Sequence, residues 1–285
     1  MSRIAYVDGR YVPHAHASVH VEDRGFQFAD GIYEVIAVIA GRRFDEPRHL
    51  DRLERSLGEL DMAMPMSRAA LCLVMDEVVR RNRVDDGILY LQVTRGAAPR
   101  DHAWRDEATP RVVMTARRQK LPSPETVAVG VGVITAPDLR WRRNDIKSVA
   151  LLGNVLGKQK AKRAGAYETW LFDDAGHVTE CTSANAWIVV DGRIVTRPLG
   201  NEILGGITRA AILDVARTLQ IPVDERLFTV DEATRADEAF LTSTTAYVMP
   251  VTAIDDRTVG DGAPGPVTTR LREEYLRVIG EFTGT

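Results

Sequence analysis

A polar segment with two prolines, residues 118–126, divides the chain and limits the folds open to it. From Arg117 the sequence reads Arg-Arg-Gln-Lys-Leu-Pro-Ser-Pro-Glu-Thr, a composition typical of a connection between domains. With 285 residues, the chain is long enough for two domains that each bury an apolar core. We therefore expect a small N-terminal domain over 1–117, a linker over 118–126 and a larger domain over 127–285.

Hydrophobic periodicity and turn residues predict both helices and strands on each side of this segment. Before it we expect strands at 4–7, 33–39, 88–94 and 111–116 and helices at 46–60 and 69–82. Beyond it we expect a strand at 127–134, a helix after Lys147, a hairpin-like pair at 169–172 and 186–190, a helix at 209–219, a strand at 239–242 and a C-terminal helix at 267–282. The N-terminal part is thus expected to form a compact α+β unit.

Composition argues against several classes of partner. Hydrophobic residues make up 45% of the chain and charged residues 27%, and no apolar stretch has the length of a membrane span. The formal net charge is -3 and the arginines are scattered among acidic residues, so we expect neither nucleic acid nor a membrane as a partner. The N-terminal sequence lacks the charged and apolar regions of a signal peptide, so we expect a cytoplasmic protein that acts on small molecules.

Cysteine and histidine positions do not indicate a metal site. Cys72 and Cys181 lie in different segments without metal-ligand spacing, which fits a reducing compartment without a disulfide framework. His14, His16 and His20 have no nearby carboxylate or cysteine pattern, so we expect loop and strand residues and no bound metal.

Lys147 is the candidate catalytic residue. It lies between Asp145-Ile146 and the run Ser148-Val-Ala-Leu-Leu, where an ammonium group loses hydration and its charged form is disfavoured. A lysine in such a setting can attack a carbonyl, form a Schiff base and shuttle protons, as pyridoxal phosphate enzymes require. The alternative is a lysine at the end of a strand that extends its amine to water.

Two further motifs could support such a cofactor. Glu180 lies at the beginning of a strand and could pair with the pyridine nitrogen, although a solvated hairpin carboxylate is the alternative. Gly205 and Gly206 precede an apolar-periodic helix, where the N–H groups of Ile207 and Thr208 could bind a phosphate. Glycine pairs before helices are common, so this second pattern is weak by itself.

A second phosphate-binding element is predicted at the end of a buried strand. The sequence Leu241-Thr-Ser-Thr-Thr-Ala246 forms a run of hydroxyl groups. Ser243 and Thr244 could complete the phosphate site, and an ordinary turn of serine and threonine is the alternative.

In order and spacing, these motifs resemble those of the fold-type IV pyridoxal phosphate aminotransferases. The resemblance is carried by Asp145-Ile-Lys-Ser-Val-Ala-Leu-Leu-Gly-Asn154, Val178-Thr-Glu-Cys-Thr-Ser-Ala-Asn185, Gly205-Gly-Ile-Thr-Arg209 and Thr242-Ser-Thr-Thr245. It implies an α+β protein with a small N-terminal α/β domain and a larger C-terminal domain with a β-barrel-like core. It also implies pyridoxal 5'-phosphate as cofactor and a homodimer. Cys181 departs from the pattern, since a small residue such as glycine or serine is more usual there.

The resemblance extends into the N-terminal domain. Asp30-Gly-Ile-Tyr-Glu34 and His49-Leu-Asp-Arg-Leu53 look like the family's substrate-side tyrosine and phosphate-contacting arginine. It implies that Tyr33 borders the substrate and that Arg52 binds the phosphate, a role that suits the planar fork of a guanidinium.

One loop, residues 95–104, resembles that of the D-amino acid transaminases. Its Arg100-Asp-His102 is similar to their carboxylate-binding pair, in which an arginine and a histidine act together with the equivalent of Tyr33. Two donors and a phenol form a good anion site, whereas in an unrelated protein the same pair would be a solvated loop.

The resemblance therefore implies transamination of D-amino acids such as D-alanine or D-glutamate. The acceptor would be an α-keto acid such as 2-oxoglutarate or pyruvate, and turnover would follow ping-pong kinetics. Alternatives within the family are a branched-chain L-amino acid aminotransferase, an (R)-amine transaminase and an aminodeoxychorismate lyase. An alternative of another class is a catalytically silent protein that binds pyridoxal phosphate.

Overall fold

A computed structural model describes residues 3–105 and 108–284. Internal contacts divide the chain into unit 1, Met1–Lys120 with Ile146–Ala150, and unit 2, Leu121–Asp145 with Leu151–Thr285. The predicted domain ranges place the segment around Lys147 in 127–285, whereas its contacts place it in unit 1. The candidate catalytic lysine thus belongs to the smaller unit by packing.

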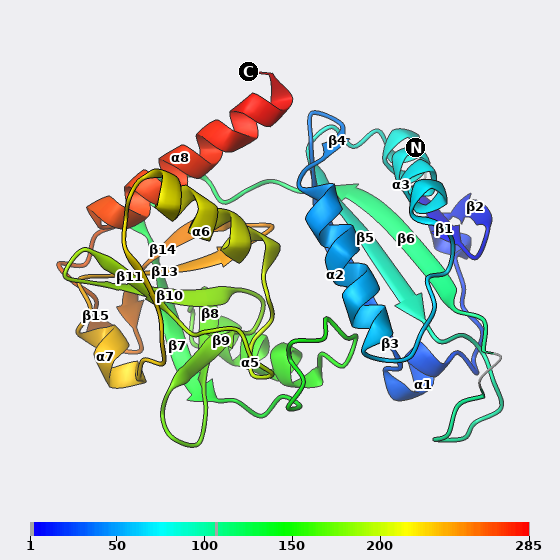
Figure 1. Ribbon diagram of the computed structural model, residues 1–285, viewed down its shortest axis with the longest axis horizontal. Helices are drawn as coiled ribbons and strands as arrows, with labels where there is room; N and C mark the ends of the chain where they lie inside the picture. Colours follow the sequence, from blue (N-terminus) through cyan, green and yellow to red (C-terminus); the bar gives the residue numbers. More distant parts are fainter. Residues whose placement is uncertain (1–2, 106–107, 285) are drawn as a thin grey trace. The chain divides into compact units, whose positions relative to one another are not determined.

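Unit 1 is an antiparallel sheet with two helices on one face (Figure 1). In order across the sheet, the strands are β2 (Arg10–Pro13), β1 (Ile4–Val7), β6 (Arg111–Arg118), β5 (Gly87–Thr94), β3 (Gly31–Ile39) and β4 (Arg42–Arg43). The short elements η1 (His14–His16) and α1 (Arg24–Phe28) precede β3. The covering helices are α2 (Glu46–Gly58) and α3 (Arg68–Asn82), and their leucines pack on buried side chains of β3 and β5 such as Ile36 and Leu91.

Alternation along β3 determines which side chains enter this core. Ile32, Glu34 and Ile36 are fully buried, and the two isoleucines belong to the core cluster shared with the helices. Tyr33, which lies between them, faces the opposite side of the sheet because successive side chains of a strand alternate. The two faces of β3 therefore carry different chemistry.

Unit 2 is built on a curled mixed sheet (Figure 1). Its strands are, in order, β12 (Val223–Glu225), β11 (Arg193–Thr196), β10 (Asn185–Val190), β13 (Glu238–Ser243), β14 (Tyr247–Ile254), β7 (Val131–Pro137), β8 (Glu168–Phe172) and β9 (Val178–Cys181), and β15 (Arg257–Thr258) pairs with β14. The terminal strand β9 also contacts β10, so the sheet curls toward itself. The helices are α4 (Pro124–Val129), α5 (Leu152–Arg163), α6 (Ile207–Thr218), α7 (Val230–Thr234) and α8 (Pro266–Thr283).

The structure confirms the α+β class and corrects two local predictions. The predicted strand at 127–134 begins instead as the helix α4, because Ser123 caps it by accepting the N–H of Thr126 and Pro124 occupies its first turn. The strands near 169–172 and 186–190 exist but do not pair with each other. β8 pairs with β7 and β9, whereas β10 pairs with β11 and β13.

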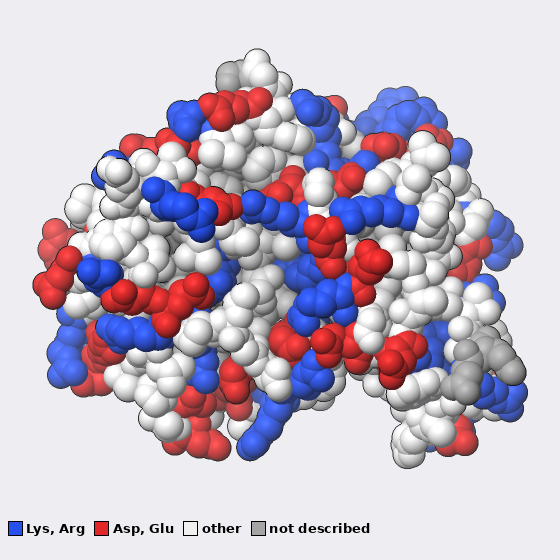
Figure 2. Space-filling model, viewed as in Figure 1, with Lys and Arg blue, Asp and Glu red and all other residues white. Residues whose placement is uncertain are grey.

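Acidic and basic side chains are interspersed over the face shown in Figure 2. Many form local pairs, such as Arg277 with Glu274 on α8 and Arg226 with Glu232, each at 2.5 Å. No described helix is long and apolar enough to cross a membrane. Within 3–105 and 108–284, no group of three or more His, Cys, Asp or Glu residues is arranged to hold a metal ion.

A buried carboxylate from β13 caps the N-terminus of α8. Glu238 accepts the N–H of Val267 at 2.9 Å and the N–H of Thr268 at 2.8 Å. The backbone of Gly265 approaches so closely that a Cβ there would lie 2.1 Å from the Glu238 carboxyl carbon. One side chain thus satisfies two N–H groups that the helix itself leaves unpaired.

We expect Glu238→Ala to lower the free energy of unfolding by roughly 1–2 kcal/mol, because helix N-terminal acceptors contribute about that much. Urea unfolding followed by circular dichroism measures the change. Glu273→Ala, at an exposed position of the same helix, is the matched control and should change stability by less than about 0.5 kcal/mol. Equal effects of the two substitutions would contradict the capping role.

Candidate active site

Lys147 lies over the ring of Tyr33 within unit 1. Its Nζ is 4.2 Å from the ring centroid. The backbone fixes this arrangement, because the N–H of Tyr33 donates to the Lys147 carbonyl at 3.0 Å and the N–H of Val149 donates to the Gly31 carbonyl at 3.0 Å. The side chain is half-buried, and among the described residues no carboxylate forms an ion pair with its amine. The main chain at Lys147 is therefore fixed to β3, and the amine lies over an aromatic ring.

A second phenol lies beside Tyr33 on this face of the sheet. Tyr90 stacks on Tyr33 with ring centroids 5.8 Å apart, and its hydroxyl donates to Gln92 at 2.7 Å. Burial, reinforced by the neighbouring Tyr33, raises the pKa of Tyr90 to about 12. This phenol therefore stays neutral at physiological pH.

Arg52, the predicted phosphate ligand, is held by a buried carboxylate on the helix side of β3. Its Nε and Nη2 donate to the two oxygens of Glu34, both at 2.7 Å, and the Nδ1 of His49 shares a hydrogen bond with Glu34 at 2.8 Å. Burial raises the pKa of Glu34, but the guanidinium and the hydrogen bonds outweigh it and hold the value at about 2. Burial also lowers the pKa of His49. The structure thus fixes the orientation of Arg52, and phosphate binding by it stays a prediction.

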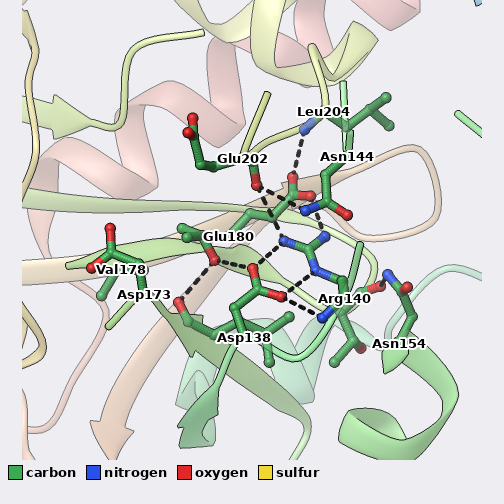
Figure 3. A network of polar contacts seen from close by, with 12 residues as sticks. Asp138, Arg140, Asn144, Asn154, Asp173, Val178, Glu180, Glu202 and Leu204 are labelled. Atoms are coloured by element: carbon green, nitrogen blue, oxygen red, sulfur yellow. Dashed lines mark hydrogen bonds and ion pairs between the residues drawn. The ribbon is translucent and has the colours of Figure 1, made fainter. Parts of the chain in front are cut away.

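Glu180 is the centre of a polar network in unit 2 (Figure 3). It lies on β9 and is buried. Arg140 donates to its Oε1 at 2.5 Å, while the side chain of Asn185 at 3.0 Å and the N–H of Leu204 at 3.1 Å donate to its Oε2. Burial raises the pKa of Glu180, and Arg140 and the N–H of Leu204 act in the opposite direction. The carboxyl is thus desolvated and held in one orientation by three donors.

Arg140 is itself fixed by a second carboxylate. Its Nε and Nη2 donate to Asp138 at 2.9 and 2.7 Å, and the hydroxyl of Thr179 donates to the same carboxylate at 2.8 Å. Only 4% of the Arg140 side chain is exposed. Burial raises the pKa of Asp138, but the hydrogen bonds and charge of Arg140 outweigh it and leave the pKa lowered. Asp138 and Arg140 were not predicted as site residues, although both follow the end of the strand β7, where polar side chains often serve a site.

The predicted phosphate-binding helix begins beside Glu180. Ile207 and Thr208 start α6, whose N-cap residue Gly206 has no side chain to cover their N–H groups. A Cβ on Gly206 would lie 2.1 Å from the Asn185 Oδ1, so any other residue there would displace the Asn185 side chain. The same Asn185 side chain binds Glu180 at 3.0 Å. The start of α6 therefore lies next to the Asn185 side chain of the Glu180 network.

Ser243 and Thr244 lie next to this network in the sheet. Asn185 on β10 pairs with Thr242 on β13, so the two hydroxyl residues follow directly at the end of β13. The Ser243 hydroxyl accepts the N–H of Ala246 at 3.2 Å, which is the turn that the sequence analysis gave as the alternative. A serine hydroxyl that accepts in a turn keeps its own hydrogen to donate, so the turn and a phosphate contact are compatible.

Arg100 and His102 approach the same aromatic ring in unit 1. The Arg100 guanidinium carbon lies 5.0 Å from the centroid of the Phe28 ring, and the His102 ring centroid lies 5.5 Å from it. Both predicted carboxylate ligands are exposed. Phe28 was not predicted as a site residue, because an aromatic at the end of a helix as short as α1 gives no distinctive sequence pattern.

The structure places the predicted site residues in two groups. Unit 1 holds Tyr33, Arg52, Arg100, His102 and Lys147, and unit 2 holds Glu180, Ile207, Thr208, Ser243 and Thr244. Their chemistry fits the expected cofactor: an amine for its aldehyde, a buried carboxylate held by an arginine for its pyridine nitrogen, and a helix N-terminus with hydroxyls for its phosphate.

Comparison with known proteins agrees with this chemistry. Residues 31–254 match the family of amino-transferase class IV. The D-alanine aminotransferase of Bacillus licheniformis is 45% identical over 266 residues, 93% of each chain, and that of Listeria innocua is 42% identical over 282 residues, 97% of each chain. The solved branched-chain aminotransferase of Thermoproteus uzoniensis with norvaline has a TM-score of 0.87 at 27% identity, covering 98% of this chain and 95% of its own. The chain belongs to the class IV aminotransferases.

Proposed function

We propose that this chain is a pyridoxal phosphate-dependent aminotransferase that transfers the amino group of a D-amino acid to an α-keto acid. D-Alanine or D-glutamate is the donor, and 2-oxoglutarate or pyruvate is the acceptor. The observation that carries the proposal is the identity of 42–45% with D-alanine aminotransferases over 93–97% of the chain. The branched-chain enzyme of Thermoproteus uzoniensis shares the fold at 27% identity, so likeness of fold alone does not choose the substrate.

The candidate residues have distinct roles in the proposed binding chemistry. Lys147 is the amine that binds the cofactor aldehyde and acts as general base toward the hydrogen on the substrate Cα. Glu180, held by Arg140 at 2.5 Å, pairs with the pyridine nitrogen. Ile207 and Thr208 donate backbone N–H groups to the phosphate, and Ser243, Thr244 and Arg52 add side-chain donors. When bound, pyridoxal phosphate stabilises the negative charge that develops on the substrate Cα.

Placement of the substrate carboxylate accounts for the preference for the D-enantiomer. We assign Arg100, His102 and Tyr33 to this carboxylate, because an arginine, a histidine and a phenol supply several donors to one anion. Lys147 reacts from one fixed side of the substrate. The side on which the carboxylate is held therefore decides which enantiomer presents its Cα hydrogen to the lysine.

The proposal is tested by the visible spectrum of the purified holoenzyme. D-Alanine added without a keto acid should abolish the absorbance of the aldehyde form, and pyruvate or 2-oxoglutarate should restore it. L-Leucine and (R)-phenylethylamine, added to separate samples, test the branched-chain and amine activities. A faster spectral change with L-leucine than with D-alanine would overturn the proposed substrate, and no change with any donor would indicate a binding protein.

Lys147→Ala should reduce the steady-state rate with D-alanine by roughly 10²–10⁴-fold or more, because it removes both the covalent anchor and the general base. Borohydride treatment of the wild-type holoenzyme followed by peptide mass mapping should locate the cofactor adduct on Lys147. Lys160→Ala, at an exposed position of α5, should leave the rate unchanged. Near-normal turnover in Lys147→Ala would remove this residue from the mechanism.

Arg140→Met should weaken cofactor binding by roughly 10- to 100-fold, because hydrogen bonds between charged groups contribute about 1.5–3 kcal/mol. Without its guanidinium the pKa of Glu180 rises further, and a neutral carboxyl no longer pairs with a protonated pyridine nitrogen. Titration of the apoenzyme with pyridoxal phosphate measures the affinity. Arg142→Met, two residues away and exposed, is the matched control, and equal affinities of the two variants would contradict the role of Arg140.

We also propose that the chain acts as a cytoplasmic homodimer. Leu152, Val155 and Leu156 on α5 are 73%, 58% and 62% exposed, and apolar side chains grouped on one helix face are typical of an interface. Cys72 and Cys181 are both free thiols, which fits a reducing compartment. Light scattering should give twice the chain mass of 31.5 kDa, and Val155→Glu should lower this value. A monomeric wild-type protein would overturn the proposed assembly.

A further inference from the structure

A buried arginine on α1 holds the loop that carries Arg100 and His102. Arg24 is 3% exposed, and its Nη1 and Nη2 donate to three successive backbone carbonyls: Asp101 at 2.6 Å, His102 at 3.0 Å and Ala103 at 3.3 Å. Its Nε donates to the carboxylate of Asp30 at 2.8 Å. One guanidinium thus binds three consecutive residues of a segment without regular secondary structure.

The ring of Phe28 supports the side chains of the same loop. The guanidinium carbon of Arg24 is 4.9 Å from its centroid, that of Arg100 is 5.0 Å away, and the His102 ring lies 5.5 Å away at 58°. A guanidinium within about 6 Å of an aromatic face is attracted by the ring. Phe28 therefore restricts where Arg100 and His102 point, while Arg24 restricts the backbone from which they project.

Asp30 ties this arrangement to the strand that carries Tyr33. Its carboxylate accepts the Nε of Arg95 at 2.8 Å in addition to the Nε of Arg24. Arg95 donates to the Leu60 carbonyl at 2.7 Å, and its guanidinium carbon lies 4.1 Å from the ring of Trp104. Asp30 directly precedes β3, so the loop and the strand share one anchor.

Loops without regular structure are usually the mobile parts of a protein. Side chains on a mobile loop bind an anion weakly, because the loop must first become ordered. The contacts of Arg24 and Phe28 remove that freedom before any substrate arrives. Neither side chain is among those assigned to the substrate or cofactor. Their contacts therefore act through the positions of Arg100 and His102.

We infer that Phe28 and Arg24 are positioning residues that determine selectivity for substrates with an α-carboxylate. The inference rests on the proposed function, since it concerns the loop assigned to the substrate carboxylate. It predicts that loss of the Phe28 ring weakens recognition of the carboxylate and leaves the reactivity of the cofactor aldehyde unchanged. A purely structural role of Phe28 would affect both properties together.

Two reagents separate these properties in the holoenzyme. Aminooxyacetate and O-methylhydroxylamine both form an oxime at the aldehyde carbon of the cofactor and release the amine of Lys147, but only aminooxyacetate carries a carboxylate. The second-order rate of absorbance loss is measured for each reagent. In Phe28→Leu, we expect the rate with aminooxyacetate to fall roughly 10- to 100-fold, since small displacements of binding groups cost about that much, and the rate with O-methylhydroxylamine to stay within about twofold.

Three further variants complete the test. Phe28→Tyr keeps the ring and should retain the preference for aminooxyacetate. Phe26→Leu, on the same helix with Phe26 74% exposed, should behave as wild type. Arg24→Lys keeps the charge but loses the fork that binds three carbonyls, so it should lower the preference by itself. If Phe28→Leu does not fold, Arg24→Lys is used in its place to test the inference.

Steady-state kinetics give a second readout. Phe28→Leu should raise the KM for D-alanine by roughly 10-fold or more and change kcat by less than about threefold, because ground-state and transition-state binding weaken together. An unchanged reagent preference in Phe28→Leu, or equal losses with both reagents, would overturn the inference.

Arg100→Ala distinguishes this failure from failure of the proposed function. If Arg100→Ala loses the preference and Phe28→Leu does not, the positioning role is wrong and the carboxylate assignment stands. If neither variant loses it, the assignment of the loop to the substrate carboxylate is wrong, and the inference fails with it. A wild-type enzyme that reacts with aminooxyacetate but does not turn over D-alanine would overturn the proposed substrate alone.

Discussion

Pairing of buried carboxylates with guanidinium groups is the constraint on which both groups of site residues depend. A buried charge without a partner costs several kcal/mol, so Glu34 requires Arg52 and Glu180 requires Arg140 at these positions. In each pair the oppositely charged groups are also hydrogen-bonded, which fixes the orientation of the two side chains as well as the distance between them. Asp30 serves two arginines in the same way. The orientation of the site residues is thus set by packing and electrostatics before any ligand binds.

Local sequence patterns were sufficient to predict the helices whose first and last residues can be recognised from the sequence around them. The helix predicted at 69–82 is α3, Arg68–Asn82, whose Ser67 caps it, and the helix predicted at 267–282 is α8, Pro266–Thr283. Strand pairing was not predictable in this way, because β8 and β10 each have one neighbouring strand that is far away in the sequence, β7 and β13 respectively. The segment around Lys147 shows the same limit, since its hydrogen bonds reach back to β3.

The candidate site likewise contains residues that lie in local sequence motifs and residues that depend on contacts distant in the sequence. Lys147 and Glu180 are candidates because they lie in contiguous motifs, whereas Arg140 contacts a residue 40 positions away. Single arginines among many give no local sign of burial. Cys181, which departs from the family pattern, is packed in the core of unit 2, and burial raises its pKa well above the usual value. Burial thus disfavours the thiolate, which is the reactive form of a cysteine.

The consecutive positions of Tyr33 and Glu34 on β3 have a consequence for how this strand can vary. The phenol faces Lys147, and the carboxylate faces Arg52 on the opposite side of the sheet. A shift of one residue moves every side chain of a strand to the other face. A single deletion or insertion near the beginning of β3 would therefore exchange both chemistries at once, so divergence here should proceed by substitution and leave the length of the strand unchanged.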